Sequence, residues 1–378
     1  MNVLSLFDGI SGTQVALDRL GVKVGKYYAS EIDKFPISIT QKNYPNTIQL
    51  GSVTDWQDWD IDWSSIDLVV GGFPCQSWSV AGLGLGDKDK RGMLFWTMLD
   101  VIKKVLANNP QAKFLMENVR MKKEFEEYIT FHTEKALGKV NKHLINSALV
   151  SAQNRKRFYW TNIDGIEQPE DQGLVLADIL MDGHVDRDKS HCLDANYFKG
   201  GNPKSYFGKS RRQLVFDRPC ELKDFDSEAE CHHVATATDI NGHDSLKRVY
   251  AATGKSPTLN TMTGGNREPK VLIVPEATKK GYTEIQDGDC FDATFPTSKT
   301  RRGRNMKYKS NCLTATNYEY MRYEHPTYRK LTPCECEALQ TFPIGYTEGI
   351  SNSQRYKCLG NSFTVSVVSH ILNYAFSS

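Results

Sequence analysis

Apolar and polar positions alternate along the N-terminal part of the chain in a way that predicts strands followed by helices. Short apolar runs predict strands at residues 3–6, 23–29, 49–53, 66–70, 113–116 and 142–147. Apolar residues at helical spacing predict helices after residue 12, at 93–107 and at 122–138, whereas the Asp- and Trp-rich stretch 54–65 predicts turn and surface. This order is typical of an α/β fold, whose open sheet binds ligands at the carboxyl ends of its strands.

The pattern changes at about residue 175. Helical periodicity is lost, and Gly, Asn, Asp, Thr and basic residues dominate, so we expect irregular β elements. A short phrase recurs there, with Lys189-Ser190-His191-Cys192-Leu193 as its first copy. Helical order returns at 331–343, where Thr332 and Glu335 predict a capping box.

The last apolar segment, 363–376, predicts a helix that must bury its surface on a core. We expect that core to be the N-terminal sheet, so that a second domain is inserted into the first. The predicted first domain comprises 1–175 and 353–378. The predicted second domain is 176–352, with a variable part at 176–325.

Length and charge add little by themselves. A chain of 378 residues suggests two or three domains, and a net charge of +2 does not indicate nucleic acid. Basic residues are nevertheless clustered in two places, where they would follow a phosphate backbone or simply form a solvated face. The clusters are Lys199, Lys204, Lys209, Arg211 and Arg212, and Lys299, Arg301, Arg302, Arg304, Lys307 and Lys309.

Nine cysteines, an odd number without Cys-x-x-Cys spacing, argue against a disulfide scaffold and for a reducing compartment. The usual zinc spacings are missing as well, so we expect no metal site. Apolar runs stay well short of the ~20 residues of a membrane span. The first residues predict a strand and not a signal peptide. A cytoplasmic protein is therefore expected.

One cysteine stands out by its position. Gly71, Gly72 and Pro74 break the strand predicted at 66–70 and leave Cys75 on a loop at its carboxyl end. A thiolate presented there is a candidate nucleophile, although a free cysteine is also common as a small, inert apolar residue. Alternating glycines and then charged residues at 80–91 predict a lid over Cys75.

Charged residues are expected at the same edge of the sheet. Glu117 follows the strand predicted at 113–116, and Arg155 and Arg157 share one side of an extended segment. They would either surround Cys75 or lie on the surface.

A glycine-containing turn, Phe7-Asp8-Gly9-Ile10-Ser11-Gly12, follows the first strand. Its glycines allow the backbone to approach a nucleoside cofactor closely. The turn does not match G-x-G-x-x-G, which argues against a dinucleotide. Glu31, at the end of the next strand, suits a ribose diol, although a carboxylate at a helix N-terminus would also suit the helix dipole.

In their joint order and spacing, the conspicuous residues resemble the C5-cytosine DNA methyltransferase family along the whole chain. One position departs from the family pattern: Gly51-Ser52 stands where the family has Gly-Asp, whose Asp meets the cofactor adenine. The motifs that carry the resemblance are Phe7-Asp8-Gly9-Ile10-Ser11-Gly12, Glu31, Phe73-Pro74-Cys75-Gln76, Glu117-Asn118-Val119, Gln153-x-Arg155-x-Arg157, Leu331-Thr332-Pro333 with Glu337 and Gln340-Thr341-Phe342-Pro343, and Gly360-Asn361-Ser362.

The resemblance implies a Rossmann-like sheet that binds S-adenosylmethionine, with an inserted, smaller, mostly β or irregular target-recognition domain. Cys75 would attack C6 of a cytosine flipped out of double-stranded DNA, and the methyl group would go to C5. Glu117 would hold N3 and the exocyclic amine, and Arg157 would contact O2 with support from Arg155.

The resemblance also implies binding residues, in a protein expected to be monomeric. The expected contacts to S-adenosylmethionine, or to its product S-adenosylhomocysteine, are Phe7, Asp8, Gly9, Gly12, Glu31, Ile32, Ser52, Pro74, Asn361 and Ser362. The expected DNA contacts are Gln76, Ser79, Arg91, Arg301, Arg302 and Arg304.

Other functions are less consistent with the sequence. A nicotinamide oxidoreductase lacks its fingerprint here, and an amino-directed methyltransferase would carry an Asp/Asn-Pro-Pro-aromatic signature. A catalytically silent DNA-binding protein would not need Cys75, Glu117 and Arg157 together. A tRNA cytosine-5 methyltransferase would not need so long an inserted domain.

Overall fold

The computed structural model describes most of the chain and divides it into two compact units. The first unit comprises Met1–Asn202, Ser210–Val215 and Arg329–Ser378, and the second comprises Pro203–Lys209 and Phe216–Tyr328. The described residues are 1–74, 92–220, 233–236, 243, 247–250, 270–271, 273–284, 289–292, 300, 305–307, 320–322 and 328–376.

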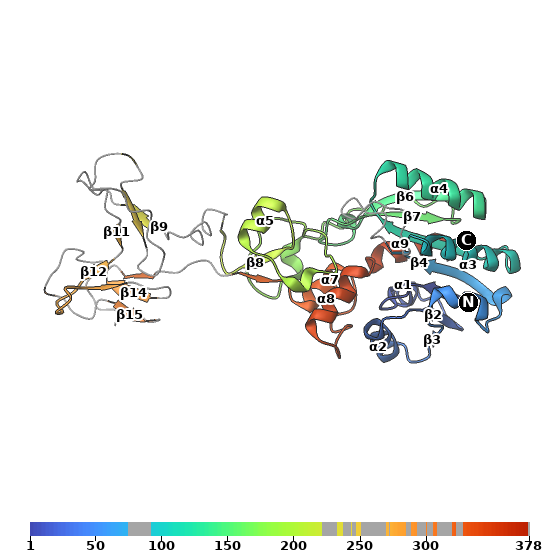
Figure 1. Cartoon of the computed structure of the whole chain (residues 1–378), viewed down its shortest axis with the longest axis horizontal. Coiled ribbons are helices and arrows are strands. Elements are labelled where there is room, and N and C mark those ends of the chain that lie inside the picture. The colour runs from blue at the N-terminus through green and yellow to red at the C-terminus, as the bar shows by residue number, and fades with distance from the viewer. Residues whose placement is uncertain are drawn as a thin grey trace. The chain divides into compact units, whose positions relative to one another are not determined.

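A seven-stranded sheet in the order β3-β2-β1-β4-β5-β7-β6 forms the centre of the first unit (Figure 1). Strands β1 to β5 are parallel, whereas β7 runs antiparallel to both β5 and β6. This confirms the predicted α/β fold. The strands are β1 (Asn2–Leu6), β2 (Tyr27–Ser30), β3 (Ile48–Gln49), β4 (Ile66–Gly71), β5 (Lys113–Val119), β6 (Asn141–Asn146) and β7 (Lys156–Thr161).

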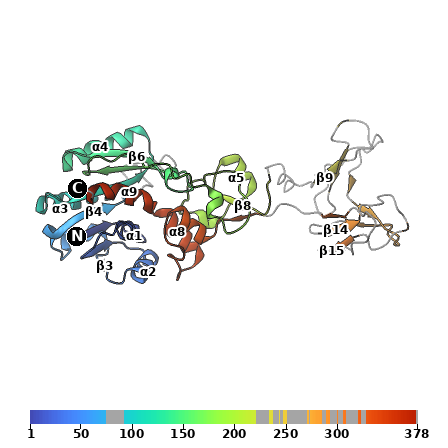
Figure 2. The ribbon, with the colours of Figure 1, turned by 180° about the vertical axis from the view of Figure 1, so that it is seen from behind.

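Helices cover both faces of the sheet because strand side chains alternate between the faces. Val3 of β1 belongs to the core shared with α1 and α9, whereas Leu4 and Leu6 belong to the core shared with α3. Figure 2 shows α9, the last helix, beside the sheet, where its apolar surface was expected. The helices are α1 (Gly12–Arg19), α2 (Lys34–Asn43), α3 (Leu94–Asn108), α4 (Lys123–Leu137) and α9 (Val365–Phe376).

The segment expected to be turn and surface is partly core. Residues there form two 3-10 helices, η1 (Val53–Asp58) and η2 (Trp63–Ser65). Trp59 between them is buried and joins the core that contains α3. The prediction of surface is right for most of this stretch, where Asp55, Asp58, Asp60 and Asp62 are exposed, and wrong at Trp59, whose large apolar ring packs into the core.

Segments on both sides of the second unit pack on the core of the first. Leu176, Tyr197, Leu331 and Leu339 are all buried in the same core as α1 and α9. The predicted boundaries after 175 and before 353 therefore fall inside the first compact unit. These segments form η6 (Leu176–Ile179), η7 (Tyr197–Lys199), α7 (Pro333–Leu339) and α8 (Asn352–Asn361), whereas η5 (Ser147–Leu149) lies between β6 and β7.

The predicted capping box is confirmed at the start of α7. The Glu335 N–H donates to Thr332 Oγ1 at 3.2 Å, and the Thr332 N–H donates to Glu335 Oε2 at 2.7 Å.

Where it is described, the second unit contains short strands and one helix that was not expected, α5 (Pro203–Lys209). The strands of this unit form small sheets in the orders β11-β10-β9, β12-β13 and β15-β14-β16. They are β9 (His233–Thr236), β10 (Arg248–Tyr250), β11 (Lys270–Val271), β12 (Ile273–Pro275), β13 (Tyr282–Glu284), β14 (Asp289–Asp292), β15 (Asn305–Lys307) and β16 (Tyr320–Arg322). Two further strands, β8 (Leu214–Phe216) and β17 (Tyr328–Lys330), pair with each other, and most of their residues belong to the first unit.

Candidate active site

A cavity of about 550 Å³ lies at the carboxyl edge of the sheet in the first unit. Its walls come from the ends of β1, β2, β4 and β5, from the last turns of α8 and from the two residues that follow α8. Most of the predicted site residues that the structure describes line it: Phe7, Asp8, Gly9, Glu31, Ile32, Ser52, Pro74, Glu117, Arg155, Arg157, Asn361 and Ser362. The sequence thus indicated both the edge and its residues.

The Glu31 carboxylate is fixed by backbone donors. Its Oε2 accepts a hydrogen bond from Gly9 N–H at 2.9 Å, and its Oε1 accepts from Ile32 and Asp33 at 2.8 and 2.9 Å. The alternative role at a helix N-terminus belongs to Asp33, which caps α2 through Phe35 N–H at 3.1 Å. Glu31 is therefore held rigidly in the cavity wall, with oxygen lone pairs left for a ligand.

Asp8 stabilises the turn after β1 through hydrogen bonds. It is buried, and it accepts hydrogen bonds from the Tyr27 hydroxyl at 2.7 Å and from Ser11. Burial raises the pKa of the Asp8 carboxyl to about 6. The turn itself uses left-handed backbone at Phe7, Gly9 and Ser11, with φ of 54°, 58° and 54°.

Gly12 was expected among the cofactor contacts, but it does not line the cavity. A Cβ atom at Gly12 would lie 2.8 Å from the Phe363 ring, which does line it. The glycine thus makes room for an aromatic side chain that the sequence did not indicate.

Ser52 lines the cavity at the position where the family pattern has Asp. It caps η1, because its Oγ accepts a hydrogen bond from Thr54 N–H at 3.2 Å and lies 2.7 Å from Thr54 Oγ1. Its hydroxyl is thus tied to the start of η1.

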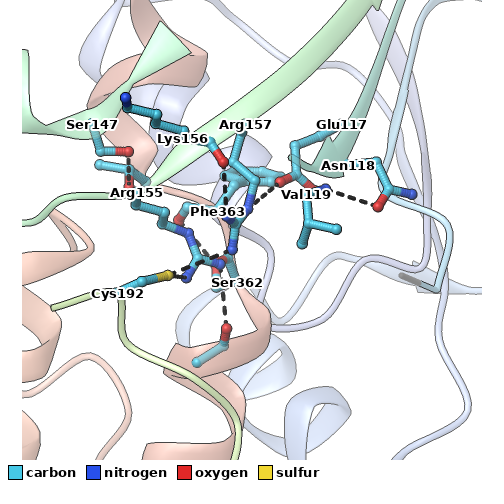
Figure 3. A network of polar contacts seen from close by, with 12 residues as sticks. Glu117, Asn118, Val119, Ser147, Arg155, Lys156, Arg157, Cys192, Ser362 and Phe363 are labelled. Atoms are coloured by element: carbon cyan, nitrogen blue, oxygen red, sulfur yellow. Dashed lines mark hydrogen bonds and ion pairs between the residues drawn. The ribbon is translucent and has the colours of Figure 1, made fainter. Parts of the chain in front are cut away.

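Glu117 and Arg157 form an ion pair across two neighbouring strands. Arg157 Nε lies 2.9 Å from Glu117 Oε1, and both side chains are largely buried (Figure 3). Strand β5 runs on to Val119, so Glu117 lies within it and not after its end, as the predicted strand 113–116 implied. The longer strand pairs Glu117 with Tyr159 and Val119 with Arg157 in an antiparallel ladder, which directs both charged groups into the cavity.

The segment between β4 and Cys75, residues 72–74, packs closely against Glu117 and Asn118. A Cβ atom at Gly72 would lie 2.9 Å from Glu117 Oε2, so a side chain here would displace the Glu117 carboxylate. Asn118 Nδ2 donates to the Phe73 carbonyl at 3.1 Å and holds the segment in place. Pro74, the residue before Cys75, lines the cavity.

Several predictions concern residues outside the described ranges. They are the nucleophile Cys75, the DNA contacts Gln76, Ser79, Arg91, Arg301, Arg302 and Arg304, and the lid 80–91. They stay predictions.

Arg155 holds the cavity wall together. Its buried guanidinium donates to the carbonyls of Leu193, Gly360 and Ser362 at 2.8, 3.2 and 2.6 Å. These bonds join the residue that precedes β7 to the segment before the second unit, to the last turn of α8 and to the residue that follows it. Arg155 was predicted as a catalytic residue in a supporting role, and the contacts show that its support is exerted through the backbone.

Cys192 is a site residue that sequence reasoning missed. Its sulfur lies 3.4 Å from Arg155 Nη1 and 3.8 Å from Arg157 Nη2 (Figure 3). Desolvation raises the pKa of the Cys192 thiol, but the charges of Arg155 and Arg157 outweigh it and leave the pKa below its ordinary value. The recurring phrase at 189–193 was the available signal.

The described residues were also expected to lack a metal site and a membrane span. Within the described ranges, no cluster of three or more His, Cys, Asp or Glu side chains is arranged to hold a metal ion. None of the described helices is both long and apolar enough to cross a membrane.

Comparison with known proteins connects this geometry to a family. Residues 1–376 match the family model described as "C-5 cytosine-specific DNA methylase". The chain is 28% identical to the orphan methyltransferase M.SPBetaI of Bacillus phage SPbeta, over 98% of this chain and 96% of that protein. It is 25% identical to the type II methyltransferase M.HgiCI of Herpetosiphon aurantiacus, over 100% and 98%.

Among solved structures, a DNMT2 mutant from Spodoptera frugiperda shares the fold. Its TM-score is 0.53 at 19% sequence identity, with 99% of each chain covered. The family model matches nearly the whole sequence, and every residue that lines the cavity lies within that match. The chain thus belongs to the C-5 cytosine-specific DNA methylase family and is a DNA cytosine-5 methyltransferase with S-adenosylmethionine as its methyl donor.

Proposed function

We propose that this methyltransferase flips one cytosine out of duplex DNA and holds it between Glu117 and Arg157 while Cys75 attacks its C6. The observation that carries the proposal is the ion pair of Glu117 and Arg157, 2.9 Å apart, beside the Gly72–Pro74 passage that leads to Cys75. A carboxyl and a guanidinium side by side match the N3, exocyclic amine and O2 edge of cytosine.

The chemistry needs a nucleophile because C5 of cytosine is itself too weak to attack a methyl group. The Cys75 thiolate forms an Sγ–C6 bond, and the electron pair of the C5–C6 double bond is displaced towards N3. N3 takes a proton that the Glu117 carboxylate passes on from solvent, and the ring becomes an enamine that is nucleophilic at C5. Arg157 stabilises the charge that develops at O2. After methylation, the C5 proton passes to solvent, the Sγ–C6 bond breaks, and N3 returns its proton.

The cavity fits S-adenosylmethionine in size and in chemistry, since pockets for ligands of this size enclose about 300–1,000 Å³. When bound, this molecule supplies the methyl group from its sulfonium. Glu31 would hold the ribose diol, Phe7 and Ile32 would pack on the adenine, and Asn361 and Ser362 would hold the methionine part. Ser52 would meet the adenine edge in place of the usual Asp.

DNA contacts are proposed for the remaining residues. A base inside a duplex cannot reach the site, so the cytosine must be flipped out. The lid at 80–91 would then close on the flipped base, and Gln76, Ser79 and Arg91 would contact the DNA. Residues 176–325 would select the DNA sequence. Arg301, Arg302 and Arg304 would hold phosphates, which fix register without reading bases.

We also propose that the protein works as a monomer in the cytoplasm of a bacterium, as the product of a bacterial or phage gene. Every group used in the mechanism belongs to one chain. The odd number of cysteines suits a reducing compartment, and the two methyltransferases of similar sequence named above come from Bacillus phage SPbeta and Herpetosiphon aurantiacus.

The test is covalent trapping. A duplex with 5-fluorocytosine at the target should stay attached to the wild-type protein, because fluorine cannot leave C5 as a proton does. Cys75→Ser should trap nothing and should transfer no methyl group, while calorimetry shows unchanged binding of S-adenosylmethionine. Methyl transfer by Cys75→Ser at the wild-type rate would refute the mechanism.

A further inference from the structure

A second, smaller cavity of about 260 Å³ lies in the first unit, and its lining includes Cys192. The other lining residues come from 154, 191–194 and 210–212. We propose that this cavity binds the DNA phosphate adjacent to the flipped cytosine and that Arg211 supplies the positive charge. The inference rests on the proposed function, since it places the backbone of the nucleotide whose base enters the site.

The cavity adjoins the proposed base site. Cys192 lines it and contacts Arg157, which in turn pairs with Glu117 (Figure 3). A flipped nucleotide stays linked to the strand, so its phosphates lie one sugar away from the base. A phosphate site is therefore required directly outside the base pocket, and this cavity occupies such a position.

The charges of the cavity suit an anion. The Arg211 side chain is exposed, and across the described part of the chain it has no hydrogen-bond or ion-pair partner. Arg212 donates one N–H to the Gly200 carbonyl at 2.8 Å, while its buried Nε finds no partner among the described residues. Two guanidinium groups thus retain donors for phosphate oxygens.

The other titratable groups leave the cavity with net positive charge. Asp194 is the lining carboxylate, and it accepts the N–H of Asn196 at 2.9 Å within its own turn. His191 is neutral at pH 7, because burial and the charge of Arg187 lower its pKa to about 4. Arg187 itself forms an ion pair with Asp186 at 2.8 Å. The two lining arginines therefore outweigh one carboxylate.

The backbone around Arg211 is held in an uncommon conformation. Ser210 and Arg212 have φ of 50° and 54°, in the left-handed region that side chains other than glycine seldom adopt. Such conformations persist only where the surroundings impose them, and they are concentrated at ligand sites. Here they flank Arg211 on both sides and fix the direction of its turn.

The experiment pairs a charge-removing variant with a charge-removing DNA. Arg211→Gln and wild type are compared on duplexes that carry the wild-type methylation site, with either normal phosphates or one uncharged methylphosphonate 5′ or 3′ of the target cytosine. Wild type should lose roughly tenfold or more in affinity on one of the two modified duplexes. Arg211→Gln should lose as much on the normal duplex and nothing further on that modified one.

The assignment would be overturned if the losses in affinity from Arg211→Gln and from the methylphosphonate were additive. It would also be overturned if Arg211→Gln bound the normal duplex as tightly as wild type. The slope of log affinity against log salt should also fall by about 0.9 in Arg211→Gln. Lys103→Gln, which removes an exposed charge on α3, is the matched control and should keep the wild-type slope. Thermal melting checks that both variants are folded.

Trapping on 5-fluorocytosine separates the two levels of the proposal. If wild type traps no duplex, the proposed mechanism fails whatever Arg211 does. If the wild-type protein traps the duplex and binds both methylphosphonate duplexes as tightly as the normal one, the proposed phosphate site is wrong and the proposed mechanism still stands.

Discussion

Arg157 Nε forms an ion pair with Glu117 Oε1 at 2.9 Å, from one strand of the central sheet to the next (Figure 3). The antiparallel register of β5 and β7 sets this pair, because Val119 lies opposite Arg157. Both groups are therefore oriented by the fold before any substrate is bound. Such preorganised charges stabilise developing charge without reorganising during the reaction.

Glu117→Gln should leave the fold intact and reduce methyl transfer. The amide keeps the shape of the carboxyl group but cannot deliver a proton to N3, so kcat should fall by about 10²- to 10⁴-fold. Incorporation of a labelled methyl group into DNA measures the rate, and calorimetry with S-adenosylmethionine is the control. A rate within threefold of wild type would exclude Glu117 as the proton donor.

Glu31→Ala should weaken the binding of S-adenosylmethionine by roughly 1–3 kcal/mol, the cost of losing a charge-assisted hydrogen bond. Three backbone N–H groups also lose their acceptor, so the turn at Gly9 loosens. Calorimetry measures the affinity. The affinity for duplex DNA should stay unchanged, and an unaltered cofactor affinity would show that Glu31 does not bind the ribose.

Asp8 should make stability depend on pH. Its pKa is about 6 in the folded protein and near 3.8 in the unfolded chain, so its protonated form favours the folded state. This contribution is complete below pH 3.8 and is lost as pH rises through about 6, with a total of roughly 3 kcal/mol.

In Asp8→Asn this loss should disappear. Relative to wild type, the variant should become more stable as pH rises from 4 to 7. Urea unfolding followed by tryptophan fluorescence measures the difference. A difference that stays constant over this pH range would contradict the assignment.

Gly360→Ala should disturb the wall of the cavity, which Gly360 lines. A Cβ atom there would lie 2.3 Å from the Asp194 carbonyl carbon, a backbone atom that cannot move away by itself. The variant should lose 1–3 kcal/mol of stability or more, by the usual cost of overpacking, and should bind S-adenosylmethionine poorly. Gly208→Ala is the matched control, since its Cβ would meet nothing within 4 Å. Equal melting temperatures for the two variants would refute the close packing.

Patterns along the chain indicated the edge at which the site lies and most strands of the sheet. The strand predicted at 23–29 begins only at Tyr27, and the strand predicted at 49–53 ends at Gln49. Alternation in β1 separates Val3 from Leu4 and Leu6, and the glycines after β4 mark the break before Cys75. Both are local properties. Spacing alone therefore placed Glu31, Glu117 and the arginines at one edge.

Contacts between distant segments were beyond such patterns. Arg155 bonds to Gly360 and Ser362, far along the sequence, and Gly12 leaves space for Phe363. Cys192 joins the site because Gln153 accepts the N–H of Leu193 at 2.8 Å. These relations depend on how three segments meet in space, and a periodic pattern carries no information about that.

Lysine substitutions should distinguish the roles of Arg155, which precedes β7, and Arg157, which lies within it. Arg155→Lys keeps one charge but cannot reach three carbonyls at once, so both stability and activity should fall. Arg157→Lys keeps the charge near Glu117 and loses the planar fork that meets O2. It should melt close to wild type, while kcat falls by about 10²-fold. Calorimetric melting measures the stability of each variant, and methyl-transfer kinetics on the same preparations measure kcat. A stable Arg155→Lys with reduced kcat would show that Arg155 acts on the base directly, because a purely structural role cannot lower the rate without also loosening the wall that it holds.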